Sequence, residues 1–245
     1  MRERLKRLRR YLAGGVVLAA MAWAGVAVAD ADDKLKQDCS FGTPAIAVPA
    51  CNTLLASGKL SAADRAWFYY GRGNAYREQK DTAQALADYS RAMEASPKDG
   101  RFPHARGRVY QDKGDLDRAI VEYTTAIALD GEQVAYYQDR GAAYQIQRKF
   151  ERAIADYDQV VRLKPKLFAG WNNRGSAYLR LGKYVNAIAD FDAAIKLDAR
   201  QAYPLYARGY AKQKSGDSAG ANADMAAAAK LMPTIASAFE VWLKD

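Results

Sequence analysis

A glycine recurs every 34 residues along most of this chain, and each one follows an arginine. The five pairs keep one register without insertion or deletion, at Arg72-Gly73, Arg106-Gly107, Arg140-Gly141, Arg174-Gly175 and Arg208-Gly209. A fixed period of this length indicates a repeat architecture, in which each copy buries its apolar face against its neighbours. Any fold of the 245-residue chain therefore has to contain five similar structural repeats.

Other positions of the repeat carry small or aromatic residues. Small residues stand twelve and nineteen residues after each glycine, at Ala85, Ala119, Ala153, Ala187 and Ala221, and at Ala92, Ala126, Val160, Ala194 and Ala228. Large residues stand sixteen residues after it, at Tyr89, Tyr123, Tyr157, Phe191 and Met225, and tyrosine stands three residues after it in the first four repeats. Glycine costs about 1 kcal/mol of helix propensity, so close helix packing must explain its use.

This small–large–small pattern resembles the tetratricopeptide repeat family from Ala66 to Ile235. The resemblance implies an all-α fold, a right-handed superhelical solenoid of five helical hairpins at 66–99, 100–133, 134–167, 168–201 and 202–235. Such an array needs caps at its ends. We expect residues 30–65 to form the N-terminal cap, with a helix over Ala50–Ala56 and a helix start at Ser61. We expect 236–245 to form a C-terminal capping helix, since its apolar residues recur at helical spacing.

The turns inside the hairpins carry their own signals. Gly114, Gly182 and Gly216 are expected to end a helix in the left-handed conformation, and the aspartates after Gly114 and Gly216 are expected to cap the next helix. Arg148 replaces this glycine in the third repeat, which predicts local backbone strain.

The first 29 residues have the layout of a secretory signal peptide. A basic stretch at 1–10 precedes an apolar stretch at 12–28, and Ala27-Val28-Ala29 fits a small-residue cleavage site. About 17 apolar residues are marginal for a membrane span, which needs roughly 20. We expect cleavage and a periplasmic or secreted protein that resembles exported bacterial members of the family. An uncleaved inner-membrane anchor is the alternative, and in that case alone the protein contacts a membrane.

The two cysteines, Cys39 and Cys51, both follow the leader closely. An even pair in an exported chain predicts a disulfide, which would add roughly 3 kcal/mol for so short a loop. A metal site would need more ligands than two thiols, and the single histidine of the chain rules out a two-histidine site.

The positive charge of the chain is concentrated in the leader. Six of the 37 basic residues and one of the 28 acidic residues lie in the first 29 positions, so the formal charge falls from +9 to +4 without them. This balance, together with export, disfavours a nucleic-acid partner.

Each arginine of the repeat has an acid at a constant distance, fifteen residues after the glycine. The planar guanidinium suits a carboxylate through two hydrogen bonds. We expect structural ion pairs rather than an anion-binding groove, at Arg72–Asp88, Arg106–Glu122, Arg140–Asp156, Arg174–Asp190 and Arg208–Asp224. A spacing of two puts Asp158 and Asp192 on other helix faces than the acids just before them, which argues against two-carboxylate catalysis.

The family resemblance places ligand contacts at set positions of the first helix of each repeat. These positions map onto Tyr70, Asn74, Arg77, Arg101, His104, Arg108, Gln111, Gln138, Gln145, Asn172, Ser176, Arg180, Tyr203, Tyr206, Tyr210 and Gln213. Amides, arginines and tyrosines suit an extended peptide. Tyr203, Tyr206 and Tyr210 are the best candidate hot spot, although the first two also fit a role in packing the C-terminal helix. His104 is expected to line the groove without a catalytic or metal role.

No motif for catalysis or nucleotide binding stands in the sequence. Phosphate-binding loops and the usual metalloprotease and serine-hydrolase motifs are absent, so we expect no cofactor and no metal. The sequence predicts a non-catalytic scaffold or adaptor of the bacterial cell envelope that binds a protein or peptide segment. The alternatives are a membrane-anchored assembly factor and, from another class, a periplasmic enzyme or carbohydrate-binding protein. The sequence assigns no oligomeric state.

Overall fold

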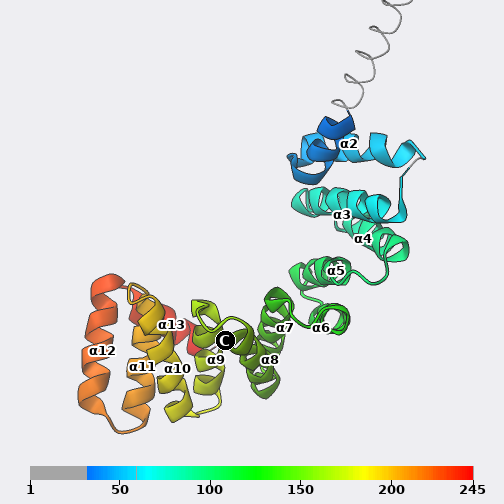
Figure 1. The fold of residues 1–245 in the computed structure, drawn as a ribbon. Coiled ribbons are helices and arrows are strands. Elements are labelled where there is room, and N and C mark those ends of the chain that lie inside the picture. Colours follow the sequence, from blue (N-terminus) through cyan, green and yellow to red (C-terminus); the bar gives the residue numbers. More distant parts are fainter. Residues whose placement is uncertain (1–31, 59, 245) are drawn as a thin grey trace, which may run out of the picture. The chain divides into compact units, whose positions relative to one another are not determined.

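Every secondary-structure element in the described part of the chain is helical. The computed structural model describes residues 32–58 and 60–244, so the expected signal peptide at 1–29 lies outside the described residues. Within the described ranges, no helix is both long enough and apolar enough to cross a membrane. The all-α repeat fold predicted from the sequence is confirmed (Figure 1).

The helices of the repeats alternate along the chain. The first helices of the five repeats are α3 (Ala62–Glu78), α5 (Arg101–Asp112), α7 (Val134–Ile146), α9 (Phe168–Arg180) and α11 (Ala202–Lys214). The second helices are α4 (Thr82–Ala95), α6 (Leu116–Leu129), α8 (Phe150–Leu163), α10 (Tyr184–Leu197) and α12 (Ser218–Leu231). The repeats are preceded by α2 (Pro44–Ala56) and followed by α13 (Ile235–Lys244).

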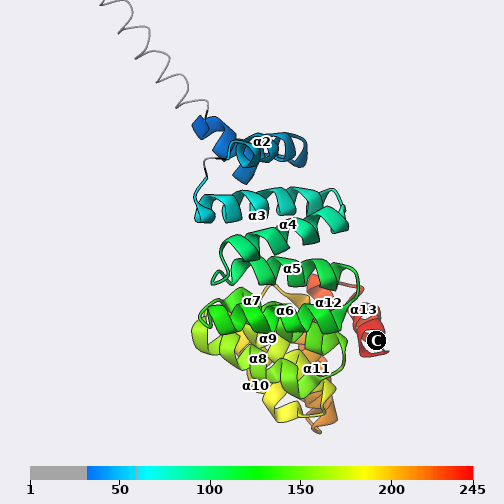
Figure 2. The same ribbon diagram turned by 90° about the vertical axis from the view of Figure 1, so that its right-hand side faces the viewer.

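The chain divides into two compact units, Met1–Pro97 and Lys98–Asp245. In the first unit α2, α3 and α4 lie in successive layers (Figure 2). In the second unit each helix from α5 to α12 packs against the next one in the chain. Within this unit the first and second helices of a repeat therefore share one interface, and the second helix shares another with the first helix of the next repeat.

An aromatic ring of the second helix lies directly on the glycine of the first helix. An added Cβ atom would come within 2.7 Å of ring carbons at Gly73 and Gly107, 2.8 Å at Gly141 and 3.0 Å at Gly175, from Tyr89, Tyr123, Tyr157 and Phe191 in that order. In the fifth repeat Gly209 instead faces the side chain of Met225 and the backbone oxygen of Ala221. All alanines at the two small positions of the second helices are fully buried. Close packing is thus the physical reason for the glycine.

The turns between paired helices have the geometry that the sequence predicts. Gly114, Gly182 and Gly216 have φ values of 77°, 69° and 91°. Arg148 takes the same left-handed conformation without being glycine, with φ of 59°, and Lys80 does so in the first repeat with φ of 62°. Such a conformation costs an L-residue roughly 1–2 kcal/mol.

Side-chain caps follow three of these turns. Asp81, Asp115 and Asp217 each accept a hydrogen bond from a backbone N–H in the first turn of the next helix. The carboxylates thereby satisfy donors that have no partner inside the helix.

The N-terminal cap is a helical segment closed by the predicted disulfide. Residues 32–41 are helical, and Cys39 in that segment bonds to Cys51 in α2. The helix expected to begin at Ala50 begins earlier, at Pro44, because proline fixes a helical φ at the first helical position and needs no N–H partner there. Ser61 caps α3 as predicted, with its Oγ accepting from the Asp64 N–H at 3.1 Å.

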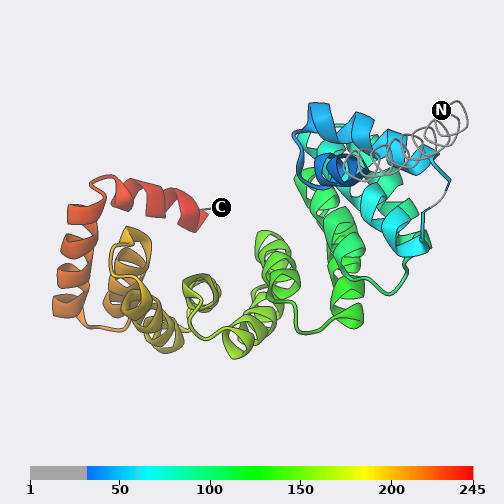
Figure 3. The same ribbon diagram turned by 45° about the horizontal axis from the view of Figure 1, so that its top comes forward.

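The C-terminal helix is present where predicted and packs on the fifth repeat, mainly on its first helix. A cap on the end of the array would lie on the outer face of α12, whereas α13 packs mainly against α11 and only lightly against α12. Figure 3 shows α13, in red, turning back from α12 across α11. The outer face of α12 offers little to an aromatic helix, since it exposes Ala223 and Ala226, while α11 offers three tyrosines.

We predict that Gly141→Ala destabilises the protein although alanine is the better helix former. Alanine adds about 1 kcal/mol of helix propensity, but its Cβ would overlap the Tyr157 ring, and overpacking of a core costs roughly 1–3 kcal/mol. Urea unfolding followed by circular dichroism should show a lower midpoint. Gly131→Ala is the matched control, since its Cβ would meet no atom closer than 3.5 Å. Equal midpoints for the two variants would contradict the packing argument.

Candidate functional site

The arginines of the repeat are structural and each binds the acid of its own repeat. The guanidinium makes two hydrogen bonds to the carboxylate, from Nε and Nη2, in the pairs Arg72–Asp88, Arg140–Asp156, Arg174–Asp190 and Arg208–Asp224, with distances between 2.5 and 2.9 Å. In the second repeat, Arg106 Nη2 donates to Glu122 Oε1 at 2.7 Å. The acids are buried, so their charge needs these partners.

The same arginines also reach the repeat before them. The remaining nitrogen, Nη1, donates to Thr124 from Arg140, to Asp158 from Arg174 and to Asp192 from Arg208. Sequence reasoning noticed Asp158 and Asp192 only as second carboxylates that did not suit catalysis. Their 34-residue spacing, which Thr124 shares, was the signal that they serve the arginine of the following repeat.

Burial and ion pairing act against each other at these acids. The hydrogen bond with Asp190 is the main cause that raises the pKa of Arg174 above its usual range. Burial alone would raise the pKa of Asp224, but hydrogen bonds from Arg208 and Lys212 outweigh burial and lower that pKa. These two shifts favour the charged forms of Arg174 and Asp224, whereas at Asp156 and Asp190 burial outweighs the hydrogen bonds from the arginine and raises the pKa of the acid.

Three amides of the predicted ligand set accept hydrogen bonds from the hydroxyls of buried tyrosines. Tyr89 donates to Asn74 Oδ1 at 2.8 Å. In the second unit, Tyr123 donates to Gln111 Oε1 at 2.9 Å and Tyr157 donates to Gln145 Oε1 at 3.1 Å. The amide oxygen is therefore engaged by the core, which fixes the side chain. The two N–H groups of each amide are the donors that a ligand can use.

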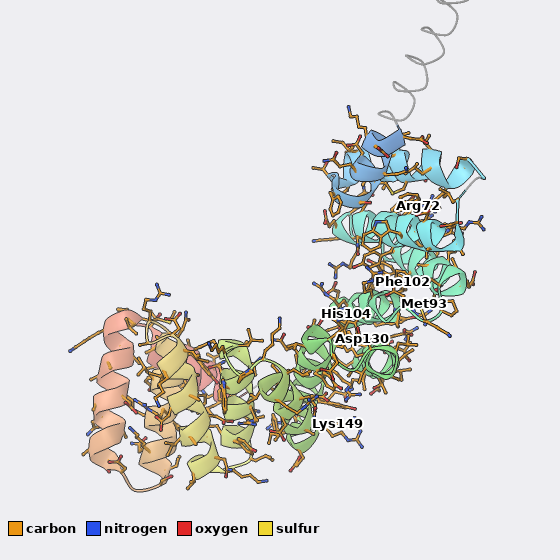
Figure 4. The ribbon with its side chains drawn as sticks, viewed as in Figure 1. Arg72, Met93, Phe102, His104, Asp130 and Lys149 are labelled. Atoms are coloured by element: carbon orange, nitrogen blue, oxygen red, sulfur yellow. A yellow bond between two sulfur atoms is a disulfide. The ribbon has the colours of Figure 1, made fainter. Side chains whose placement is uncertain are left out.

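Other predicted residues of the second unit already have polar partners. His104 Nε2 lies 2.7 Å from Asp139 Oδ2 and stacks on Tyr136, so the histidine joins α5 to α7 (Figure 4). Ser176 Oγ lies 3.1 Å from the Tyr203 hydroxyl. Arg101 binds Asp99 and is exposed. These side chains lie on first helices of the repeats, and part of their hydrogen-bonding capacity is already used within the protein.

The remaining predicted residues fall into exposed and packed groups. Arg108 and Gln213 are exposed, and Gln138 and Asn172 are partly buried on α7 and α9. In the first unit Tyr70 of α3 contacts the rings of Trp67 in the same helix and of Tyr89 in α4. Arg77 lies in the last turn of α3, the helix that also carries Arg72 (Figure 4).

The candidate hot spot of the fifth repeat is covered by the chain itself. We call Tyr203, Tyr206 and Tyr210 the tyrosine cradle. Phe239 of α13 lies 5.8, 5.1 and 5.4 Å from their ring centroids and is 1% exposed. Burial accordingly raises the pKa of Tyr203. Of the two roles that the sequence left open, the structure assigns these tyrosines to packing of the C-terminal helix.

A cavity of about 400 Å³ lies beside α13. Its lining includes Gln145, Ile146, Phe150, Arg180 and Trp242, from α7, α8, α9 and α13. Ile146 is 62% exposed, so the apolar surface continues beyond the area that α13 covers. Among residues 32–58 and 60–244, no group of three or more acidic, histidine or cysteine side chains is placed to hold a metal ion.

Comparisons with known proteins agree with this geometry. Models of the tetratricopeptide repeat match residues 66–99, 104–166 and 139–204. Among curated proteins no sequence relative matches the chain. In structure the chain is similar to YrrB, described as a TPR protein with an unusual peptide-binding site, with a TM-score of 0.68 and 18% identity over 78% of this chain and 97% of that one.

Crystal structures of MamA are similar as well. One has a TM-score of 0.65 and 20% identity, covering 71% of this chain and 95% of the other. MamA from Desulfovibrio magneticus RS-1 has a TM-score of 0.64 and 17% identity, covering 70% and 97%. At these identities the likeness concerns the fold.

We predict that Arg174→Ala destabilises the protein by about 3 kcal/mol, because it leaves the buried Asp190 without its partner. Replacing both residues, as Arg174→Met with Asp190→Leu, should recover most of the loss. Lys196→Ala in the same repeat is the control, since Lys196 is exposed. Urea midpoints measure all three. A double variant no more stable than Arg174→Ala would show that the arginine acts otherwise than by neutralising Asp190.

Proposed function

The chain belongs to the tetratricopeptide repeat family, and we propose that it is a non-catalytic scaffold that binds a protein or peptide segment on the first helices of its repeats. The observation that carries this proposal is the fixed amide pair of the second unit, Gln111 and Gln145. Each offers N–H donors on the first-helix surface while its oxygen is held by a buried tyrosine.

Fixed donors suit the backbone of an extended segment. Backbone carbonyls of a bound segment need hydrogen-bond donors, and a donor that is already ordered loses little entropy on binding. Exposed Arg108 and partly buried Gln138 add polar contacts on α5 and α7. The peptide-binding site ascribed to YrrB, a protein of the same fold, is consistent with this use of the surface.

We further propose that the protein works outside the cytoplasm, in the bacterial cell envelope. The signal-like layout of residues 1–29 supports this location, and so does the Cys39–Cys51 disulfide, which persists in oxidising compartments. Sequencing the N-terminus of the mature protein distinguishes the two forms: a start at Asp30 indicates a cleaved, periplasmic or secreted protein, and an intact leader indicates an inner-membrane anchor.

The binding surface is tested by site-specific photocrosslinking in living cells. We expect p-benzoylphenylalanine at Gln138, on the first-helix surface, to give a discrete protein adduct. The same group at Val121, which is 63% exposed on α6, should give none.

A matched pair of substitutions removes the donors without disturbing the core. Gln111→Glu and Gln145→Glu keep an acceptor oxygen for Tyr123 and Tyr157 but replace the amide N–H groups with a carboxylate. Together they should abolish the adduct at Gln138 while leaving the melting temperature nearly unchanged. An adduct that persists in this variant, or that forms equally at Val121, would refute binding on this surface.

A further inference from the structure

The C-terminal helix occupies the first-helix surface in the manner of a bound ligand. Ile235 is buried at the start of α13, and Phe239 is buried one turn later in the tyrosine cradle. Trp242 follows at 5.6 Å from Tyr203, with the two rings nearly perpendicular. The outer face of α13 stays in solvent, with Val241 59% exposed. An aliphatic residue, an aromatic residue four positions later and a second three positions after that form the contact.

Arg180 recognises the end of this helix. Its Nη1 donates to the backbone oxygen of Trp242 at 2.9 Å. That carbonyl lies in the last turn of α13, where carbonyls lack a partner within the helix. The guanidinium also lies 5.2 Å from the Trp242 ring and 5.1 Å from the Phe150 ring. A cation at the C-terminal end of a helix is favourable for its dipole as well.

A short connection joins α13 to α12, and a cavity remains beside α13. Met232, Pro233 and Thr234 alone join it to α12. A helix of ten residues is only marginally stable by itself in water, so α13 depends on its contacts with the tyrosine cradle. The cavity beside Trp242 leaves apolar surface open at Ile146. A helix from another protein could fill that cavity with one more apolar side chain than α13 supplies.

We propose that the tyrosine cradle and Arg180 form a binding site for an amphipathic helix of a partner protein, and that α13 is its internal occupant. The partner helix carries the same aliphatic–aromatic–aromatic register and displaces α13. The inference rests on the proposed function, because it assigns a ligand class to the same first-helix surface. Until α13 is displaced, it lowers the apparent affinity of the site.

Tethering explains why the site is closed in the free protein. A segment held by a short link has an effective concentration of about a millimolar. A free helix with the same contacts competes poorly against it, whereas a helix that also fills the Trp242 cavity competes better. Weakening α13 should therefore open the site to a free copy of the same sequence.

The test uses a labelled synthetic peptide of residues 233–245 and the full-length protein, followed by fluorescence anisotropy. We expect Phe239→Ala protein to bind the peptide at least about tenfold more tightly than the unsubstituted protein. Val241→Ala changes the exposed face of the same helix and should behave like the unsubstituted protein. Adding Arg180→Gln to the Phe239→Ala protein should weaken peptide binding several-fold.

Specificity is tested by a peptide of identical composition in which Phe239 changes places with Glu240 and Trp242 with Leu243. This peptide should not bind. Equal binding of the two peptides, or equal binding to unsubstituted and Phe239→Ala protein, would overturn the proposal. If Phe239→Ala fails to fold by circular dichroism, Trp242→Ala takes its place, since Trp242 is only partly buried.

Failure of this inference is distinguishable from failure of the proposed function. If a folded, opened variant does not bind the peptide, α13 is a permanent part of the fold and the helix site is refuted. The photocrosslink at Gln138 then still reports on the amide surface, because Gln138 does not line the cavity beside α13.

Discussion

In the first four repeats, the contact between a glycine of the first helix and an aromatic ring of the second sets how the two helices pack. Where the ring lies on the backbone, as at Gly73 and Tyr89, a single added methyl group would be too close. The contact sets how near the two helices approach, and the alanines around it allow that approach along the whole interface. Because it recurs every 34 residues, the same hairpin geometry recurs as well.

The ion pairs between the arginines and the acids depend on this contact between glycine and ring. Arginine precedes the glycine and the acid precedes the ring, so bringing glycine and ring together also brings Arg174 to Asp190. Only then does the third nitrogen of the arginine reach Asp158 in the preceding second helix. Apolar packing therefore defines the register, and the ion pairs connect repeats within it. Their burial makes them costly to break and gives them little freedom to serve a ligand.

The repeated contacts could be predicted from the sequence because every repeat carries similar residues at the same positions. The repeat period, the role of Arg148 in its turn and the disulfide followed from spacing and residue type, and the hairpins followed from the family resemblance. The surface that α13 covers was left open between two roles of Tyr203 and Tyr206, since an amphipathic pattern shows that a helix has an apolar face but not which surface covers it. The bond from Tyr157 to Gln145 was missed for a related reason: a side chain assigned to a ligand was also needed by the core.

Function in such an array depends on where the repeats differ. The positions of the tyrosine cradle are polar or small in the three repeats before it, at Arg101, His104 and Arg108, at Ala135, Gln138 and Ala142, and at Ala169, Asn172 and Ser176. A surface of that kind favours hydrogen bonding to an extended backbone, whereas three tyrosines favour the apolar face of a helix. One scaffold thus presents two chemically distinct surfaces on equivalent helices. The fifth repeat differs because its tyrosines bury Phe239, and the repeats before it have no such helix to cover.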